Sequence, residues 1–128
     1  AMATSTNSGL NTIRFSGADF APTASFKLLQ KAIEVAKEKN IPIKAGGVLS
    51  SDELYADDFE SYKKWADYGV LCVEMETSGL YTVAAKHNVN ALSILTISDS
   101  LVTKERTTSE EREHTFKEMI EIALELAE

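Results

Sequence analysis

Two continuous hydrophobic runs, at residues 70–73 and 91–97, each lead directly into acidic residues. The segment between them, residues 77–88, has the length and the Ala, Leu and Tyr content of one helix. The order strand, helix, strand predicts a parallel pair of strands joined by a right-handed crossover. Uninterrupted apolar runs are also typical of strands covered on both faces. This part of the chain therefore predicts an α/β fold.

The flanking pattern predicts a helix over 24–39, a strand over 41–50 and a helix over 57–68. Pro22 and Thr23 suit the start of the first helix, while Asn40 and Pro42 mark its end. The first nine residues are small and polar, and we interpret them as a strand end or a loop. No internal repeat or low-complexity linker is visible, so one domain over residues 1–128 is predicted.

The last predicted helix begins with a capping box, in which Thr108 is the N-cap and Glu111 follows three residues later. An apolar stripe with helical period follows it, formed by Phe116, Met119, Ile120, Ala123, Leu124 and Ala127. Arg112 lies one turn before Phe116 on the same face, so we expect it to point inward. A cation there needs an anionic partner. Asp99 is one candidate, and pairing with Glu110 or Glu111 in solvent is the alternative.

Acidic side chains follow both hydrophobic runs, with Glu74 and Glu76 after the first and Asp99 after the second. In a parallel sheet both groups lie outside the carboxyl ends of the strands, where α/β folds bind ligands. Glu74 fits a binding site and a helix cap equally well. Glu76 also fits the first turn of the next helix, where it would interact with the helix dipole. Capping explains Asp99 less well, because residues 98–100 open no obvious helix.

Composition narrows the class of protein. The 128 residues are 44% hydrophobic and 26% charged, as in an ordinary globular domain. A formal charge of −7 and the lack of a Lys/Arg cluster among aromatics argue against nucleic-acid binding. No apolar run approaches the roughly 20 residues that cross a bilayer, and no signal peptide is visible. We therefore expect a cytoplasmic protein with no membrane partner.

Cysteine and histidine usage gives little sign of further chemistry. Cys72, the single cysteine, lies within the first hydrophobic run, so a buried, inert thiol is the favoured interpretation. His87 and His114 lie on different predicted helices and neither belongs to a cluster with ligand spacing. The sequence thus predicts no metal site.

Several distinct short motifs are spread along the chain. They are Asn-Thr-Ile-Arg-Phe at 11–15, Ser-Asp-Glu-Leu-Tyr at 51–55, Val-Glu-Met-Glu at 73–76, Ser-Gly-Leu-Tyr at 78–81, Leu-Thr-Ile-Ser-Asp at 95–99, Thr-Thr at 107–108, Glu-Arg at 111–112 and Thr-Phe at 115–116. Together they resemble the bacterial hexameric-type purine nucleoside phosphorylases of the nucleoside phosphorylase superfamily. The Ser-Asp followed at this distance by Glu-Arg separates them from the uridine phosphorylases and the methylthioadenosine nucleosidases of the same superfamily.

The resemblance implies a three-layer αβα phosphorylase-type fold, here its C-terminal half, with a mixed, largely parallel sheet flanked by helices. It implies that Asp99 is the general acid that protonates purine N7 as the glycosidic bond breaks, assisted by Arg112. The other implied nucleoside-binding residues are Glu76 at the ribose hydroxyls, Met75 against the sugar, Val73 and Glu74 lining the purine pocket, Ser98, and Leu54 and Tyr55 on the base side. Leu54 stands where the family usually has an aromatic that stacks on the purine.

Members of this family are about twice as long, and the resemblance places the missing part at the N-terminus, where the phosphate-binding glycine loop and arginines lie. The implied reaction is phosphorolysis of purine (deoxy)ribonucleosides, with phosphate as co-substrate and no cofactor. The implied partners are the missing N-terminal half and further copies, in a homohexamer arranged as a trimer of dimers. Two alternatives stay open, a nucleosidase that uses water and a non-catalytic nucleoside-binding or assembly module.

Overall fold

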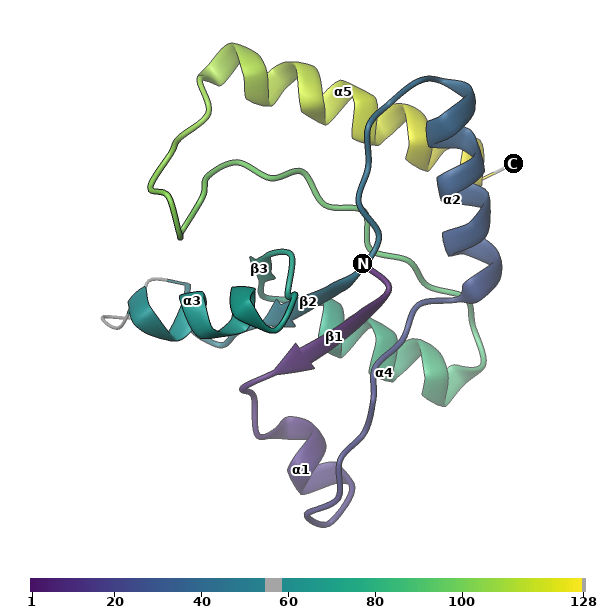
Figure 1. Ribbon diagram of the computed structural model, residues 1–128. Helices are drawn as coiled ribbons and strands as arrows, with labels where there is room; N and C mark the ends of the chain where they lie inside the picture. Colours follow the sequence, from purple (N-terminus) through teal and green to yellow (C-terminus); the bar gives the residue numbers. More distant parts are fainter. Residues whose placement is uncertain (55–58, 128) are drawn as a thin grey trace.

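The computed structural model describes residues 1–54 and 59–127 as helices around a parallel sheet (Figure 1). The strands follow the order β1 (Ala3–Thr6), β2 (Gly47–Ser50) and β3 (Val73–Glu74). The register sets Thr6 beside Ser50 and Ser50 beside Glu74, so the three strands end at one edge. The predicted α/β class is confirmed, and the strands among the described residues are all parallel rather than mixed.

The helices of the described ranges are α1 (Leu10–Arg14), α2 (Phe26–Glu38), α3 (Phe59–Asp67), α4 (Thr77–His87) and α5 (Ser109–Leu126). The predicted helices are therefore present, with ends that differ from the expected ones by a few residues. Ser25 rather than Pro22 or Thr23 begins α2, because its hydroxyl accepts the backbone N–H of Leu28. α4 packs against β1, whereas α2 packs against α5 at the opposite side of the sheet (Figure 1).

The hydrophobic core lies between α2 and α5. Ala32, Val35 and Ala36 from α2 meet Ile122 from α5, and all four are buried. Partly buried side chains extend this cluster, namely Ile41, Leu92, Ile94 and Leu126. The core therefore connects both helices to the residues that precede β2 and to those that follow α4.

Three of the predicted strands are wrong over most of their length, and of residues 70–73 only Val73 lies in a strand, β3. The strand expected at 41–50 is present only as β2, and residues 91–97 form no strand. The expected parallel pair of 70–73 with 91–97 is therefore absent, and β3 pairs with β2 instead. The physical reason is that a strand requires a neighbour for its backbone groups. The apolar side chains of Leu92 and Ile94 pack against the core, but the backbone there forms no hydrogen-bonded ladder with a neighbouring strand.

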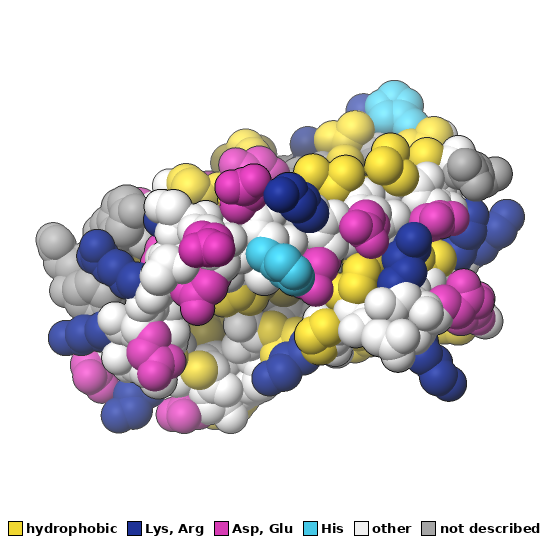
Figure 2. Space-filling model, turned by 90° about the horizontal axis from the view of Figure 1, so that it is seen from above, with side chains coloured by type: hydrophobic (Ala, Val, Ile, Leu, Met, Phe, Trp, Pro, Cys, Tyr) yellow, Lys and Arg dark blue, Asp and Glu magenta, His cyan; other side chains and the backbone are white. Residues whose placement is uncertain are grey.

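The outward face of α5 also differs from the prediction. The side chain buried against the core is Ile122, 2% exposed, whereas Phe116, Ile120 and Leu124 are 46%, 50% and 65% exposed. The helix is turned so that Ile122, rather than the predicted stripe, faces α2. Figure 2, which looks down on the molecule from above, shows hydrophobic side chains exposed among charged ones on this face.

None of the helices in residues 1–54 and 59–127 combines the length and the apolar character needed to cross a bilayer.

The capping box predicted for α5 is confirmed. The Thr108 hydroxyl accepts the Glu111 N–H at 3.2 Å, and the Glu111 carboxylate accepts the Thr108 N–H at 2.8 Å. Thr108→Ala should lower the free energy of unfolding by about 1 kcal/mol, because it leaves helix N–H groups without an acceptor. Urea unfolding followed by circular dichroism measures this. The control is Thr12→Ala, whose exposed side chain caps no helix; an equal loss in both variants would contradict the role of the cap.

Candidate functional site

A pocket of about 340 Å³ opens beside the carboxyl end of β3, between this strand, α3 and residues 95–102. It brings together five of the residues predicted for the site from three separate parts of the chain, and these are Leu54, Val73, Glu74, Ser98 and Asp99. Tyr62 and Trp65 of α3 line it as well. Glu74 and Asp99 therefore line one pocket, although Asp99 does not end a strand and the strand pair expected from the sequence is absent.

Glu74 is held by hydrogen bonds to both of its carboxylate oxygens. Its Oε1 accepts the Ser50 hydroxyl, and its Oε2 accepts the backbone N–H groups of Glu76 at 2.8 Å and Thr77 at 2.7 Å. These two N–H groups lie at the start of α4, whose N-cap residue Glu76 makes no capping hydrogen bond with its own side chain. The helix-cap interpretation of Glu74 is therefore realised in the structure, and its contact with a nucleoside stays a prediction.

The environment of Glu74 keeps its carboxylate ionised. Burial alone would raise the pKa of Glu74, but the hydrogen bonds from Ser50, from the backbone of Glu76 and Thr77 and from the Thr77 side chain outweigh burial and lower it. A charged carboxylate at this position also complements the partial positive charge at the start of α4.

Ser50 is the central residue of this cluster and is absent from the residues proposed from the sequence. It is buried, it donates to Glu74, it contacts the Thr4 hydroxyl at 2.9 Å, and it accepts the Ser78 N–H at 2.8 Å. It thereby joins all three strands to α4. One signal could have found it, because Ser50 follows an apolar run in the same way that Ser98 follows residues 91–97.

Asp99 lies in an exposed loop over the pocket. Residues 98–107 fold back on themselves through hydrogen bonds from Ser100 N–H to Glu105 C=O at 2.8 Å and from Thr107 N–H to Ser98 C=O at 3.1 Å. The Ser98 hydroxyl contacts the Asp99 carboxylate at 3.2 Å. The pocket is open beside Asp99, so its carboxylate is available to a ligand.

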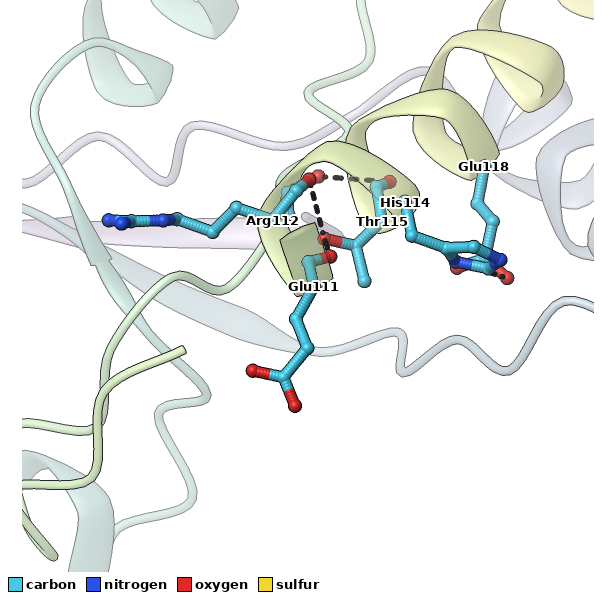
Figure 3. Close-up of polar contacts among 6 residues, drawn as sticks. Glu111, Arg112, His114, Thr115 and Glu118 are labelled. Atoms are coloured by element: carbon cyan, nitrogen blue, oxygen red, sulfur yellow. Dashed lines mark hydrogen bonds and ion pairs between the residues drawn. The ribbon is translucent and has the colours of Figure 1, made fainter. Parts of the chain in front are cut away.

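Arg112 does not contact Asp99 in this structure. Its side chain is half-buried, and within residues 1–54 and 59–127 its guanidinium makes no ion pair or hydrogen bond. Figure 3 shows it extended away from the other labelled residues of α5. The alternative pairing with Glu111 is not formed either, because the hydrogen bonds from Thr108 occupy that carboxylate and lower the pKa of Glu111.

Met75 and Glu76 are exposed and do not line the pocket, so the structure does not bring these two predicted ribose contacts to Asp99. Both lie in the short connection from β3 to α4. Tyr55, predicted on the base side, lies outside the described residues, and Leu54 lines the pocket.

Cys72 borders the pocket and carries a protonated thiol. Burial raises the pKa of Cys72, and the nearby Glu74 charge raises it further, while the N-terminal amine acts in the opposite direction. A thiol of raised pKa is a poor nucleophile, which supports the interpretation of Cys72 as inert, although its side chain is half-buried rather than buried. No group of three His, Cys, Asp or Glu side chains with the geometry of a metal site occurs in the described part of the chain.

A parallel α/β fold with a pocket at the carboxyl ends of its strands is the arrangement of many ligand-binding α/β proteins. Comparison with known proteins gives the family: residues 4–128 match the sequence model described as Phosphorylase superfamily. The chain belongs to the phosphorylase superfamily.

Several similar curated relatives share the name "Purine nucleoside phosphorylase DeoD-type". The protein of that name from Thermoanaerobacter sp. (strain X514) is 62% identical over 128 residues, and the one from Clostridium novyi (strain NT) is 60% identical over 128 residues. Each alignment covers 100% of this chain and 55% of the relative. The chain thus spans about half the length of the curated relatives that it matches.

A solved structure supports the fold. The crystal structure of purine nucleoside phosphorylase from Toxoplasma gondii in complex with immucillin-H superposes with a TM-score of 0.76. The superposition covers 97% of this chain and 52% of that one, at 20% sequence identity. At this identity the likeness concerns the fold.

The lowered pKa of Glu74 leads to a prediction of how the stability of the chain depends on pH. Because the folded-state pKa lies below the ordinary value of 4.5, the contribution of Glu74 to stability is complete above that pH and is lost as pH falls through the folded-state pKa. Glu74→Gln should therefore lose stability at pH 7 and show a smaller further loss between pH 5 and pH 3. Urea unfolding across this range measures both effects.

The matched control is Glu121→Gln, because Glu121 is exposed and its side chain has no hydrogen-bond partner in the described residues. It should retain the stability of the unmodified chain at pH 7 and the same decline in acid. If Glu74→Gln declined in acid as steeply as this control, the ionised helix-cap role of Glu74 would be wrong.

Proposed function

We propose that this chain provides the nucleoside-binding half of an enzyme that cleaves purine (deoxy)ribonucleosides with phosphate, giving the free base and (deoxy)ribose 1-phosphate. The observation that carries the proposal is the single pocket that joins Asp99 and Ser98 to Val73, Glu74 and Leu54. The name shared by relatives about 60% identical supports the same reaction.

Asp99 acts as the general acid. Cleavage of the glycosidic bond leaves negative charge on the departing base and positive charge on the sugar, so protonation of purine N7 improves the leaving group. The exposed position of Asp99 at the pocket mouth allows it to meet the base directly. The engaged carboxylate of Glu74 is unsuited to this role, because its hydrogen bonds stabilise the ionised form.

Arg112 assists Asp99 only during the reaction. A permanent guanidinium contact would stabilise the carboxylate and oppose proton delivery, whereas a contact made as the base departs would stabilise the charge left on Asp99. The absence of an Asp99–Arg112 pair from the described structure fits a conditional contact. Movement of the loop 98–107 or of the first turn of α5 would bring the two side chains together.

The sugar lies over the connection from β3 to α4. There the Glu76 carboxylate accepts hydrogen bonds from the two ribose hydroxyls, and Met75 packs against the sugar. Such contacts orient the substrate and favour an oxocarbenium-like transition state. Glu74 supports them indirectly, because it binds the Glu76 N–H and so fixes the backbone of this connection. Leu54, which lines the pocket, covers the base.

Phosphate is the co-substrate and no cofactor takes part. Its site belongs to the part of the relatives that this chain does not span, which by resemblance is the N-terminal half. A homohexamer arranged as a trimer of dimers and a cytoplasmic location stay predictions.

Phosphate dependence distinguishes the proposed reaction from its alternatives. The assay uses a chimera in which this chain replaces the corresponding part of the Thermoanaerobacter relative, and it follows inosine cleavage with and without phosphate. We expect cleavage only with phosphate. Equal rates in both conditions would instead indicate a nucleosidase, and inosine binding without turnover would indicate a non-catalytic module.

Asp99→Asn in the same chimera should lower kcat for inosine by roughly 10²–10⁴-fold while the dissociation constant of inosine changes little, because only proton transfer is lost. Steady-state kinetics and calorimetry measure the two quantities. Asp67→Asn, an exposed position in the last turn of α3 that does not line the pocket, is the control and should keep full activity. Undiminished kcat for Asp99→Asn would rule out the general acid.

A further inference from the structure

Thr107 lies at the end of the loop 98–107 and makes two hydrogen bonds to one acceptor. Its hydroxyl donates to the Ser98 C=O, and its backbone N–H donates to the same oxygen at 3.1 Å. Thr107 and Ser98 are half-buried, whereas the residues between them are mostly exposed. The two hydrogen bonds therefore close the base of an otherwise solvent-exposed loop.

The acceptor belongs to the peptide bond directly before Asp99. A peptide bond is planar, so the Ser98 C=O and the Asp99 N–H turn together as one unit. Two other contacts join the arms of the loop, a bridge between Asp99 and Arg106 and the hydrogen bond from the Ser100 N–H to the Glu105 C=O at 2.8 Å. The hydrogen bonds at the base differ from these because they fix the orientation of the peptide from which Asp99 extends.

The side chain of Asp99 has few contacts that could hold it in place. Among the described residues its carboxylate contacts only the Ser98 hydroxyl, at 3.2 Å. A shift of a reacting group by about 1 Å can lower a rate by roughly 10²-fold, so a general acid needs a defined position. The backbone on which Asp99 is mounted must supply that position.

Thr107 is also connected to the helix that carries Arg112. It lies directly before Thr108, the N-cap of α5. The Thr108 C=O accepts the Arg112 N–H at 3.1 Å, which places Arg112 in the first turn of the helix. Figure 1 shows the chain turning back at this loop before it enters α5. One threonine thus links the peptide before Asp99 to the helical turn of Arg112.

We propose that Thr107 is a positioning residue for Asp99 and acts through its hydrogen bonds to the Ser98 C=O. The inference rests on the proposed function, because it takes Asp99 as the proton donor to purine N7. Thr107 does not line the pocket, so it acts on the reaction only through the Asp99 backbone.

A substrate methylated at N7 distinguishes proton delivery from other steps. In inosine, the Asp99 carboxyl gives its proton to N7, the C1′–N9 electron pair passes to the base, and a phosphate oxygen bonds to C1′. In 7-methylinosine the base is positively charged before cleavage, so the same bond breaks without proton transfer and the base leaves neutral. A defect confined to the position of the acid therefore lowers the turnover of inosine alone.

The test measures kcat for both substrates in the chimera with the Thermoanaerobacter relative. Thr107→Val removes the hydroxyl and keeps the shape of the side chain, whereas Thr107→Ser keeps the hydroxyl. Thr107→Val should lower kcat for inosine by at least about tenfold and leave kcat for 7-methylinosine within about threefold. Thr107→Ser should stay within about threefold of the unmodified chimera for both substrates.

The matched control is Thr103→Val in the same loop. The Thr103 side chain is exposed, and its hydroxyl donates to the Glu105 carboxylate at 3.0 Å rather than to Ser98. This variant should keep both activities. An equal loss for the two substrates in Thr107→Val would indicate general damage and overturn the inference. Unchanged inosine turnover in Thr107→Val, equal damage by Thr107→Ser, or the same selective loss in Thr103→Val would overturn it as well.

Asp99→Asn, measured with the same two substrates, separates this inference from the proposed function. Loss for both substrates or for neither would contradict the general acid and the inference together. Selective loss for inosine in Asp99→Asn without selective loss in Thr107→Val would contradict the positioning role alone.

Hydrogen exchange with mass spectrometry reports on the loop whether or not the chimera turns over substrate. In Thr107→Val, exchange of the peptide that contains residues 98–107 should become faster by at least about threefold, because the base of the loop opens more often. Thr103→Val should leave the exchange of the Ser98–Thr107 closure unchanged. Equal exchange in Thr107→Val and the unmodified chimera would overturn the inference even if neither substrate were cleaved.

Discussion

The Ser50–Glu74 hydrogen bond is the interaction on which the arrangement of the site depends. It joins the ends of β2 and β3, and the same two residues receive the N–H groups of Glu76, Thr77 and Ser78 at the start of α4. Thr4 extends the cluster to β1. Because a carboxylate in this position is stable only when its oxygens are hydrogen-bonded, strand ends and helix start are held in one geometry.

The hydrogen bonds of this cluster hold the backbone through Glu74, whereas the proposed proton transfer belongs to Asp99. Glu74, with both oxygens engaged, is a rigid group that fixes the backbone before α4, while Asp99 is exposed in the hydrogen-bonded loop 98–107 and its carboxylate contacts only the Ser98 hydroxyl among the described residues. The proposed role of Asp99 as a proton donor fits this difference, since a donor must respond to charge that appears only as the bond breaks.

Short-range patterns in the sequence predicted the features that depend on neighbouring residues, such as helix positions and caps. The capping box of α5 and the helices around residues 24–39 and 77–88 follow from short-range patterns. Glu74 and Asp99 line one pocket as expected, although the strand pair from which this was inferred is absent. The pairing of strands and the orientation of helices depend on residues far apart in the sequence, so they were less predictable. Ile122 faces the core although the stripe through Phe116 and Ile120 has the clearer period, because the contact with α2 decides which side of α5 is buried. Ser50 was missed although it follows Val48 and Leu49 as Ser98 follows residues 91–97, because its partners Thr4, Glu74 and Ser78 are distant in the sequence.

The failed strand predictions and the open site have a common physical origin in backbone pairing. Residues 91–97 have the apolar content of a buried strand, whereas residues 41–46 contain Pro42 and Lys44 and are mostly exposed. In the described structure neither segment forms a ladder beyond Gly46. Residues 95–97 also line the candidate pocket, so the missing ladder leaves one wall of that pocket without lateral support. Asp99 follows Ile97 by two positions, so the place of this carboxylate at the pocket depends on a segment that no strand pairing fixes.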